Sequence, residues 1–166
     1  MEISLLSDHY LVQRLTEDSI AEIYTLCRNN ILYYHYCPPF VTEDSIANDM
    51  KALPPDKEYS DKYYLGYYEG EKLIAVIDLI LSFPDKDTAF IGFFMTDTTV
   101  QNAGIGSMII DTLCSYLKEI GFSSVRLGWV KGNPQSEHFW KKNHFIETGA
   151  AYDTDDYTVV IAKRTI

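Results

Sequence analysis

The middle of the chain changes to a hydrophobic period of two, which leaves little freedom in how this part folds. Residues 63–68, 73–81 and 88–96 are rich in aromatic and β-branched residues, and the turn segments 69–71 and 83–87 separate them. Consecutive strands that are joined by such short turns pair antiparallel. The sequence therefore predicts a meander of three antiparallel strands that leads into a glycine-bearing loop.

The rest of the chain is predicted to form helices and strands around this meander. Alternation predicts further strands over residues 9–16, 124–130, 145–150 and 157–162. Helical spacing of apolar residues predicts helices over 20–27, 42–53 and 105–120, and a short one from Asn133 and Pro134. The stretch 33–40 (YYHYCPPF) is expected to be a loop. This order predicts an α/β fold with a mixed sheet, in one domain over residues 1–166.

Composition excludes several classes of protein. Apolar residues make up 46% of the 166 residues, enough to fill a core, so a disordered or fibrous chain is excluded. Fourteen basic and 24 acidic residues give a net charge of −10. A general nucleic-acid binder or a protein that adheres to anionic membranes would carry a basic stripe, which is absent here. The excess of carboxylates suits a cationic or amine partner.

Cysteine usage and hydropathy favour a cytoplasmic protein. Cys27, Cys37 and Cys114 lack the spacing of a zinc ribbon or redox motif, so reduced thiols are expected. Residues 1–10 contain two acidic residues and no basic one, which does not fit a secretory signal. The longest nearly apolar run, residues 73–83, is too short to span a bilayer.

The sharpest functional signal is the segment 96–107 (TDTTVQNAGIGS), between a predicted strand and an amphipathic helix. Gly104 and Gly106 let a ligand approach the backbone without obstruction by a Cβ atom. The unpaired amides of the first helical turn point into the same space. They can hold a pyrophosphate without any basic side chain, although two glycines at a helix start also fit a simple tight turn.

Two other phosphate-binding loops do not fit this segment. A P-loop requires Gly-Lys-Ser/Thr, but Ser107 follows Gly106 directly. A dinucleotide-binding fold requires a third glycine and an early parallel βαβ unit, whereas position 109 is Ile and the motif follows an antiparallel meander. A nucleotide-binding regulatory domain would also leave the segment 133–145 unexplained.

The whole arrangement resembles the GNAT superfamily of acetyl-CoA-dependent N-acyltransferases. The family motif Gln/Arg-x-x-Gly-x-Gly/Ala corresponds to Gln101, Gly104 and Gly106. A downstream Asn followed by an aromatic-Lys-Gly-Phe pattern corresponds to Asn133 and residues 140–145, with His144 near the usual glycine position. The resemblance implies a GNAT-like sheet, mixed but mostly antiparallel, that is flanked by helices and splayed between its fourth and fifth strands.

The resemblance also implies which residues bind acetyl-CoA as co-substrate. The pyrophosphate would lie on the amides of the loop that begins at Gln101, namely those of Asn102, Ala103, Gly104, Ile105, Gly106 and Ser107. The preceding strand would pair with the pantetheine arm through the backbone of Phe94, Met95 and Thr96. Asn133 would donate a hydrogen bond to that arm and Ser136 would line the channel. Asn133 equally fits a helix cap before Pro134.

Two residues are candidates for the catalytic chemistry, in which an amine attacks the thioester directly. Trp140 stands where many family members carry a Tyr that protonates the departing thiolate; its indole can only donate a hydrogen bond, or it can serve core packing. Asp78 interrupts an apolar strand. It is either the general base or anchor for the acceptor's ammonium, or a buried structural partner, or exposed at a strand edge.

The acceptor pocket in this family is shaped by the first helices and the last strands. The loop 33–40 is therefore expected to be either a wall for the substrate or a packed lid, and His35 is a possible base or a surface residue. No His, Cys or carboxylate set has metal-ligand spacing, so no metal is expected.

The resulting hypothesis is a cytoplasmic N-acetyltransferase that transfers the acetyl group of acetyl-CoA to an amine. The acceptor would be a small molecule or a peptide, and the composition favours a cationic small molecule. The alternative is a catalytically silent acyl-CoA-binding sensor or assembly module, since the family's Tyr is missing. The Tyr-rich strand makes a homodimer possible, and the sequence does not identify the acceptor.

Overall fold

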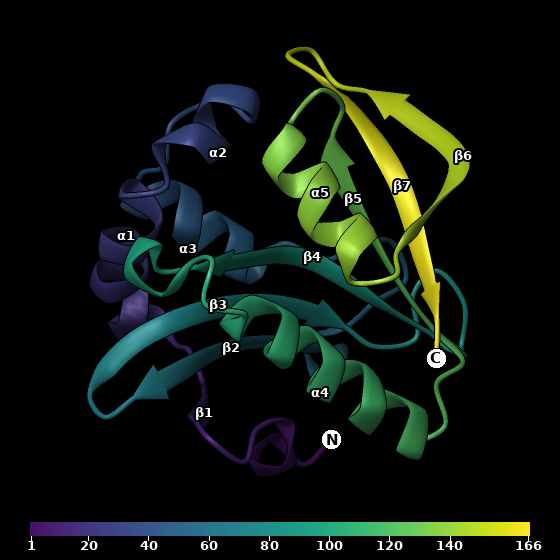
Figure 1. Ribbon diagram of the computed structural model, residues 1–166, viewed down its shortest axis with the longest axis horizontal. Coiled ribbons are helices and arrows are strands. Elements are labelled where there is room, and N and C mark those ends of the chain that lie inside the picture. Colours follow the sequence, from purple (N-terminus) through teal and green to yellow (C-terminus); the bar gives the residue numbers. More distant parts are fainter.

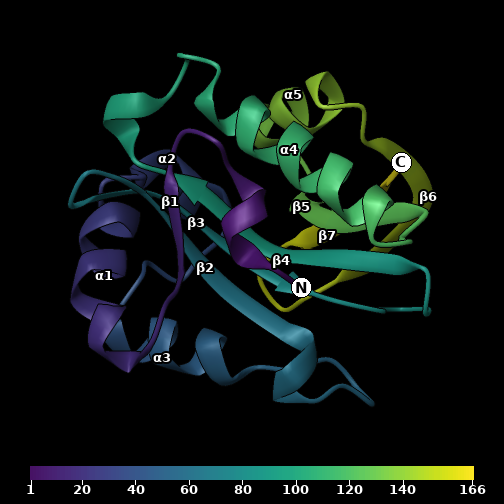
Figure 2. The ribbon, with the colours of Figure 1, turned by 90° about the horizontal axis from the view of Figure 1, so that it is seen from below.

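The computed structural model, which describes residues 1–166, places a seven-stranded sheet between two layers of helices (Figures 1 and 2). The strands are β1 (Leu11–Arg14), β2 (Lys62–Glu69), β3 (Lys72–Ile80), β4 (Thr88–Thr96), β5 (Ser124–Val130), β6 (Ile146–Asp153) and β7 (Thr158–Thr165). The helices are α1 (Ile20–Arg28), α2 (Ile31–Tyr36), α3 (Glu43–Lys51), α4 (Ile105–Glu119) and α5 (Pro134–Lys142). No helix is long and apolar enough to cross a bilayer.

The strand order is β1-β2-β3-β4-β5-β7-β6, and only the β4–β5 pair is parallel. The meander β2-β3-β4 is antiparallel, as its alternation and short turns predict. The sequence prediction of a mixed, mostly antiparallel sheet flanked by helices is therefore confirmed.

Different helices cover the two faces of the sheet (Figure 2). Each face buries a separate apolar cluster. Helix α4 covers one face with Ile109, Leu113 and Leu117, which recur at helical spacing and are fully buried. Helices α1 and α3 cover the other face with Ile23 and Ile46. The central strands β2 and β3 are covered on both sides, which explains why their sequences are nearly continuous apolar runs.

The structure corrects one predicted element and adjusts several boundaries. Part of the stretch 33–40, expected to be a loop, belongs to helix α2. Strand β1 is shorter than the predicted 9–16, and the last two strands extend beyond 150 and 162. Helix α2 has no residue that is fully buried, so it lacks the apolar stripe by which periodicity identifies a helix.

Candidate functional site

The parallel pair β4–β5 opens partway along its length. The two strands pair from Thr88 with Ser124 as far as Ile91 with Leu127, and no pairing follows. At the closed end, the hydroxyls of Thr88 and Ser124 form a buried hydrogen bond of 2.9 Å. The splay between the fourth and fifth strands is thus present, as the sequence resemblance implied.

A β-bulge lies where the two strands part. On β3, Asp78 pairs with Phe93 and the next residue, Leu79, pairs with Ile91, so Gly92 is an extra residue of β4. The bulge bends β4 away from β5 and leaves the backbone edge of residues 92–96 on that side without a partner strand. This free edge can accept an extended ligand.

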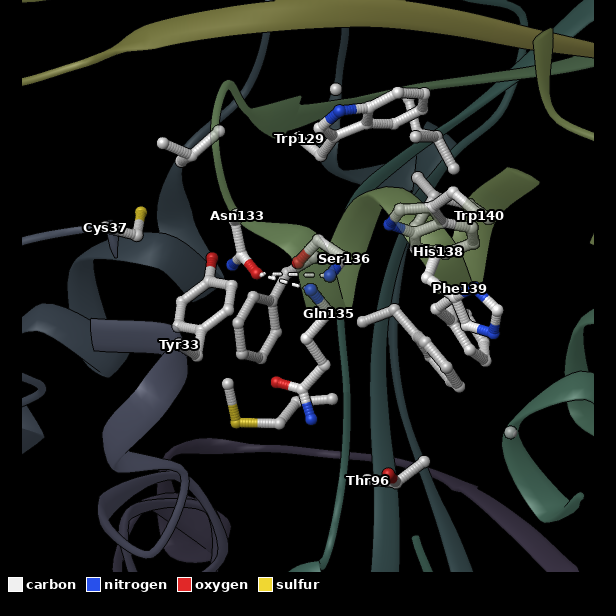
Figure 3. A pocket seen from close by; sticks show the side chains of 18 of the residues that line it. Tyr33, Cys37, Thr96, Trp129, Asn133, Gln135, Ser136, His138, Phe139 and Trp140 are labelled. Carbon is white, nitrogen blue, oxygen red and sulfur yellow. Dashed lines mark hydrogen bonds between the residues drawn. The ribbon is translucent and has the colours of Figure 1, made fainter. Parts of the chain in front are cut away.

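The opening is a cavity of about 530 Å³. Its walls come from α2, from the open halves of β4 and β5, from the loop before α4, from α5, and from the β6–β7 hairpin. Figure 3 shows side chains from several of these elements converging on one space. Such a concave site with mixed apolar and polar walls is typical of small-molecule binding.

The glycine loop forms one end of the cavity. Asn102 and Gly104 adopt positive φ angles of 62° and 84°, and Gly104 is the N-cap of α4. The left-handed backbone turns the chain sharply, so that the first amides of α4 are free and lie at the cavity. Gly106 is tightly covered, because a Cβ atom there would stand 3.1 Å from the ring of Phe139.

A side-chain link connects this loop to the N-terminal helices. Gln101 donates its amide to the side-chain oxygen of Asn30 (2.7 Å) and to the carbonyl of Thr96 (3.2 Å). Asn30, between α1 and α2, is itself buried and donates to the carbonyls of Leu26 and Thr96. Gln101 therefore positions the loop rather than presenting a free amide to a ligand.

Asn133 caps a helix and also lines the cavity. Its side-chain oxygen accepts hydrogen bonds from the backbone amides of Gln135 and Ser136, each 3.1 Å long, and so caps α5 (Figure 3). Pro134 occupies the first helical position. The residue also lines the cavity, and its side-chain nitrogen donates to no protein group. That nitrogen is free for a ligand.

Trp140 lies in an aromatic cluster at the cavity wall. Its ring contacts those of Phe139, Phe145 and Phe94, with centroids 4.9, 5.1 and 5.9 Å away. Only 7% of the residue is exposed, yet it lines the cavity. Packing is therefore one role of Trp140, and the indole remains within the site.

Asp78 is buried beside the bulge and does not itself line the cavity. Its Oδ2 accepts a 2.8 Å hydrogen bond from the Lys62 ammonium, which also donates to the carbonyl of Ala52. Its Oδ1 is buried without any partner. Burial raises the pKa of Asp78, although the bond to Lys62 opposes this.

Only a glycine separates Asp78 from the cavity. Gly92 lines the cavity wall, and a Cβ atom on it would stand 2.8 Å from Oδ2 of Asp78. A larger residue at this position would displace the carboxylate. The absence of a side chain at Gly92 therefore lets the Asp78 carboxylate lie directly against a residue of the cavity wall.

The opposite end of the cavity is lined by α2 and the β6–β7 hairpin. Tyr33 and Cys37 come from the first, Tyr152 and Tyr157 from the second. Hydrogen bonding to the Cys37 thiol and burial raise the pKa of Tyr157; burial, above all, raises the pKa of Tyr33. His35 lies on α2 against Tyr36 and does not line the cavity.

Most residues expected to bind the co-substrate meet at this cavity. Those that line it are Phe94, Met95, Thr96, Gln101, Asn102, Gly104, Gly106, Ser107, Asn133 and Ser136. Ala103 and Ile105 do not line the cavity, so only their backbone amides are left as candidates for binding the co-substrate. The structure brings no three His, Cys, Asp or Glu residues together as a metal site.

Several wall residues carry no signal in the sequence. Trp129, Tyr152 and Tyr157 belong to the last strands and their hairpin, and His138 and Lys142 lie on α5. Pairing of β5 with β7 along the whole of β5 brings the β6–β7 hairpin, and with it Tyr152 and Tyr157, to the strand whose open half lines the cavity. Alternation along a strand separates its two faces but does not tell which face meets a ligand.

Comparisons with known proteins agree with this geometry. Residues 20–145 match the model of the acetyltransferase (GNAT) family. Comparison with curated proteins found no match.

Several solved structures share the fold. An acetyltransferase from Thermus thermophilus has a TM-score of 0.75 at 14% identity, covering 95% of this chain and 97% of that one. The ribosomal-protein-S18-alanine N-acetyltransferase from Escherichia coli has a TM-score of 0.67 at 15% identity, with coverages of 95% and 94%. Spermidine N-acetyltransferase from Vibrio cholerae, in complex with CoA and spermine, has a TM-score of 0.68 at 17% identity and coverages of 96%. At these identities the likeness establishes the fold alone.

Proposed function

Because the chain belongs to the acetyltransferase (GNAT) family, we propose that it transfers the acetyl group of acetyl-CoA to a primary amine by direct attack on the thioester. The observation that carries this proposal is the splay between β4 and β5, which joins a loop of free amides to a free strand edge in one cavity. Both features suit the two parts of CoA, its pyrophosphate and its extended pantetheine arm.

The residues at the cavity fit this co-substrate. Amides at the start of α4 hold a pyrophosphate without basic side chains, which reconciles an anionic ligand with a chain of net charge −10. The edge of Phe94, Met95 and Thr96 has no partner strand on this side and would pair with the amide groups of pantetheine, although the Thr96 carbonyl already accepts from Asn30 and Gln101. The free nitrogen of Asn133 would donate to the same arm. Acetyl-CoA, when bound, supplies the activated acetyl group.

The acceptor amine must lose a proton when it is acetylated. The amine nitrogen forms a bond to the carbonyl carbon, the carbon–sulfur bond breaks with its electron pair on sulfur, and the amine's proton passes to a base. We assign this base to Asp78, through a water molecule at the Gly92 bulge. The raised pKa of Asp78 and its unpartnered Oδ1 support the assignment, because a carboxylate with a higher pKa is a stronger base.

Trp140 acts on the leaving group. An indole N–H is far too weak an acid to protonate a thiolate, but it can donate a hydrogen bond to the sulfur. A thiol pKa of about 8.5 makes CoA a tolerable leaving group near neutral pH, so a hydrogen bond suffices. Replacement by Phe keeps the aromatic packing and removes the donor, and we expect it to lower kcat about tenfold.

Thiol release from acetyl-CoA with a panel of amines tests the function, together with the affinity for CoA from calorimetry. We expect Asp78→Asn to lower kcat/KM about 100-fold while the Kd for CoA stays unchanged. Protonation of the amine lowers kcat/KM at acidic pH in both proteins, and we expect the additional decline caused by protonation of Asp78 to be absent in the variant.

Asp111→Asn is the matched control, since Asp111 also forms an ion pair, with Arg164 at 2.7 Å, away from the cavity. It should leave kcat/KM unchanged. Binding of CoA without thiol release for any amine would instead identify a silent acyl-CoA sensor, and absence of CoA binding would refute both functions.

A further inference from the structure

The cavity wall has no acidic side chain. Its lining residues include His138 and Lys142 on α5 but no Asp and no Glu. The nearest carboxylate described above, that of Asp78, is already neutralised by Lys62 at 2.8 Å. The acidic surplus of the chain therefore lies outside the cavity and offers no counter-ion to a cation inside it.

The acceptor end is aromatic and uncharged. Tyr33 and Phe93 pack edge to face with ring centroids 6.0 Å apart, and Trp129, Tyr152 and Tyr157 also line the cavity. Burial and contact with the Cys37 thiol raise the phenol pKa values of Tyr33 and Tyr157, so both hydroxyls stay neutral at physiological pH. This end presents ring faces and neutral hydroxyls only.

The cavity is lined on this side by two segments that are far apart in the sequence. Cys37 follows α2 and Tyr157 precedes β7, and both line the cavity. An acceptor that enters between these segments meets side chains on both sides, which suits a compact body.

A second ammonium group would be costly in this environment. An unpaired charge that enters a low-dielectric site loses its hydration without compensation. Contact with the face of an aromatic ring stabilises one cation by only about 0.5–2 kcal/mol. This stabilisation is available to the single ammonium group that is then deprotonated and acetylated. A polyamine would bring further charges that meet no carboxylate.

We propose that the acceptor is a compact primary monoamine with an aromatic or aliphatic body, held between α2 and the β6–β7 hairpin. This inference rests on the proposed transferase function and narrows its acceptor. Net charge alone suggests a cationic substrate. The inference differs from this suggestion, because the acidic residues that give the chain its negative charge do not line the cavity.

Two matched amines test the inference. Hexylamine and 1,6-diaminohexane differ only in the second amino group, and 2-phenylethylamine, spermidine and a short peptide with a free N-terminus complete the panel. We expect kcat/KM for hexylamine to exceed that for 1,6-diaminohexane by at least about tenfold, although the diamine has two reactive ends. 2-Phenylethylamine should be used at least as well as hexylamine.

An added carboxylate should reverse this preference. Tyr152 is 55% exposed and lines the cavity, so Tyr152→Glu places a counter-ion at the mouth with little risk to folding. We expect it to raise kcat/KM for the diamine about tenfold relative to hexylamine. Ala151→Glu is the control, because Ala151 is an exposed neighbour on β6 that does not line the cavity, and it should change nothing.

The outcomes separate this inference from the function on which it rests. Equal or better use of 1,6-diaminohexane, spermidine or the peptide would overturn the acceptor assignment and leave the transferase intact. CoA binding without turnover of any monoamine would also overturn it. Absence of CoA binding in calorimetry would remove the transferase function itself.

Discussion

The two ends of the cavity present different chemical groups. The end at the glycine loop presents backbone: free amides of α4, the unpaired edge of β4 and the cap of α5. The other end presents side chains from α2, β4, β5 and the β6–β7 hairpin. Under the proposed function, the backbone groups would recognise what all acyl-CoA molecules share, whereas the side chains would select an acceptor. Substitutions at one end should therefore leave the function of the other end intact.

The largest effect is expected at the buried ion pair of Lys62 and Asp78, beside the bulge of β4. Lys62→Met leaves the Asp78 carboxylate buried without its partner, and we expect the free energy of unfolding to fall by about 3–5 kcal/mol. Chemical denaturation measures this. Lys51→Met is the control, since the pair of Lys51 with Glu17 is exposed and should contribute less than about 1 kcal/mol. If both variants lost a similarly small free energy of unfolding, the pair of Lys62 with Asp78 would not be a buried ion pair.

At the glycine loop, steric bulk should abolish co-substrate binding. Gly106→Val puts methyl groups against Phe139 and over the first amides of α4, so we expect the Kd for CoA to rise about 100-fold. Calorimetry measures this affinity. Ala103→Val adds the same bulk to an exposed residue of the loop that does not line the cavity, and it should keep wild-type affinity. Equal losses would show that the loop conformation, not access to the amides, is decisive.

Asn133 allows the cap and the ligand contact to be separated. Asn133→Asp keeps an oxygen that caps α5 but removes the donating nitrogen, so we expect an unchanged Tm and about tenfold weaker CoA binding. Asn133→Ala removes both groups and should lower Tm as well. Wild-type affinity in Asn133→Asp would reduce the residue to a helix cap.

The smallest effect concerns the turn that leads into the glycine loop. Burial raises the pKa of Asp97, but hydrogen bonds from Thr99 and the Lys72 ammonium outweigh it, so the pKa lies below the usual 3.8. The stability that this carboxylate contributes is present above pH 3.8 and is lost as pH falls through its lowered folded pKa. Asp97→Asn should cost less than about 1 kcal/mol at neutral pH. Denaturation at several pH values should show this difference vanish in acid, and a constant difference would rule out a charge effect.

The same contrast explains how much could be predicted. The prediction matches the bounds of β4 and β5, the start of α4, and the cap at Asn133. Each of these features depends on residues that are close together in the sequence. Residues 33–40 were expected as a possible substrate wall, but the helical conformation of residues 33–36 was missed, because the half-buried aromatic residues of α2 follow no helical stripe. Asp78 was identified as unusual, but its partner Lys62 was not, since the pairing depends on the register between β2 and β3.

By itself, the sequence determined a central meander, a loop of free amides at the start of a helix, and the resemblance that joins them into one family. These features depend on local periodicity and on backbone chemistry, which neighbouring residues specify. Only the tertiary structure decided that Gln101 meets Asn30, that Gly92 lies over Asp78, and that Cys37 and Tyr157 line the same cavity. Such contacts join segments that are distant in the sequence. The strand order, the bulge of β4 and the β6–β7 hairpin bring these segments together, so no local sequence pattern encodes the contacts.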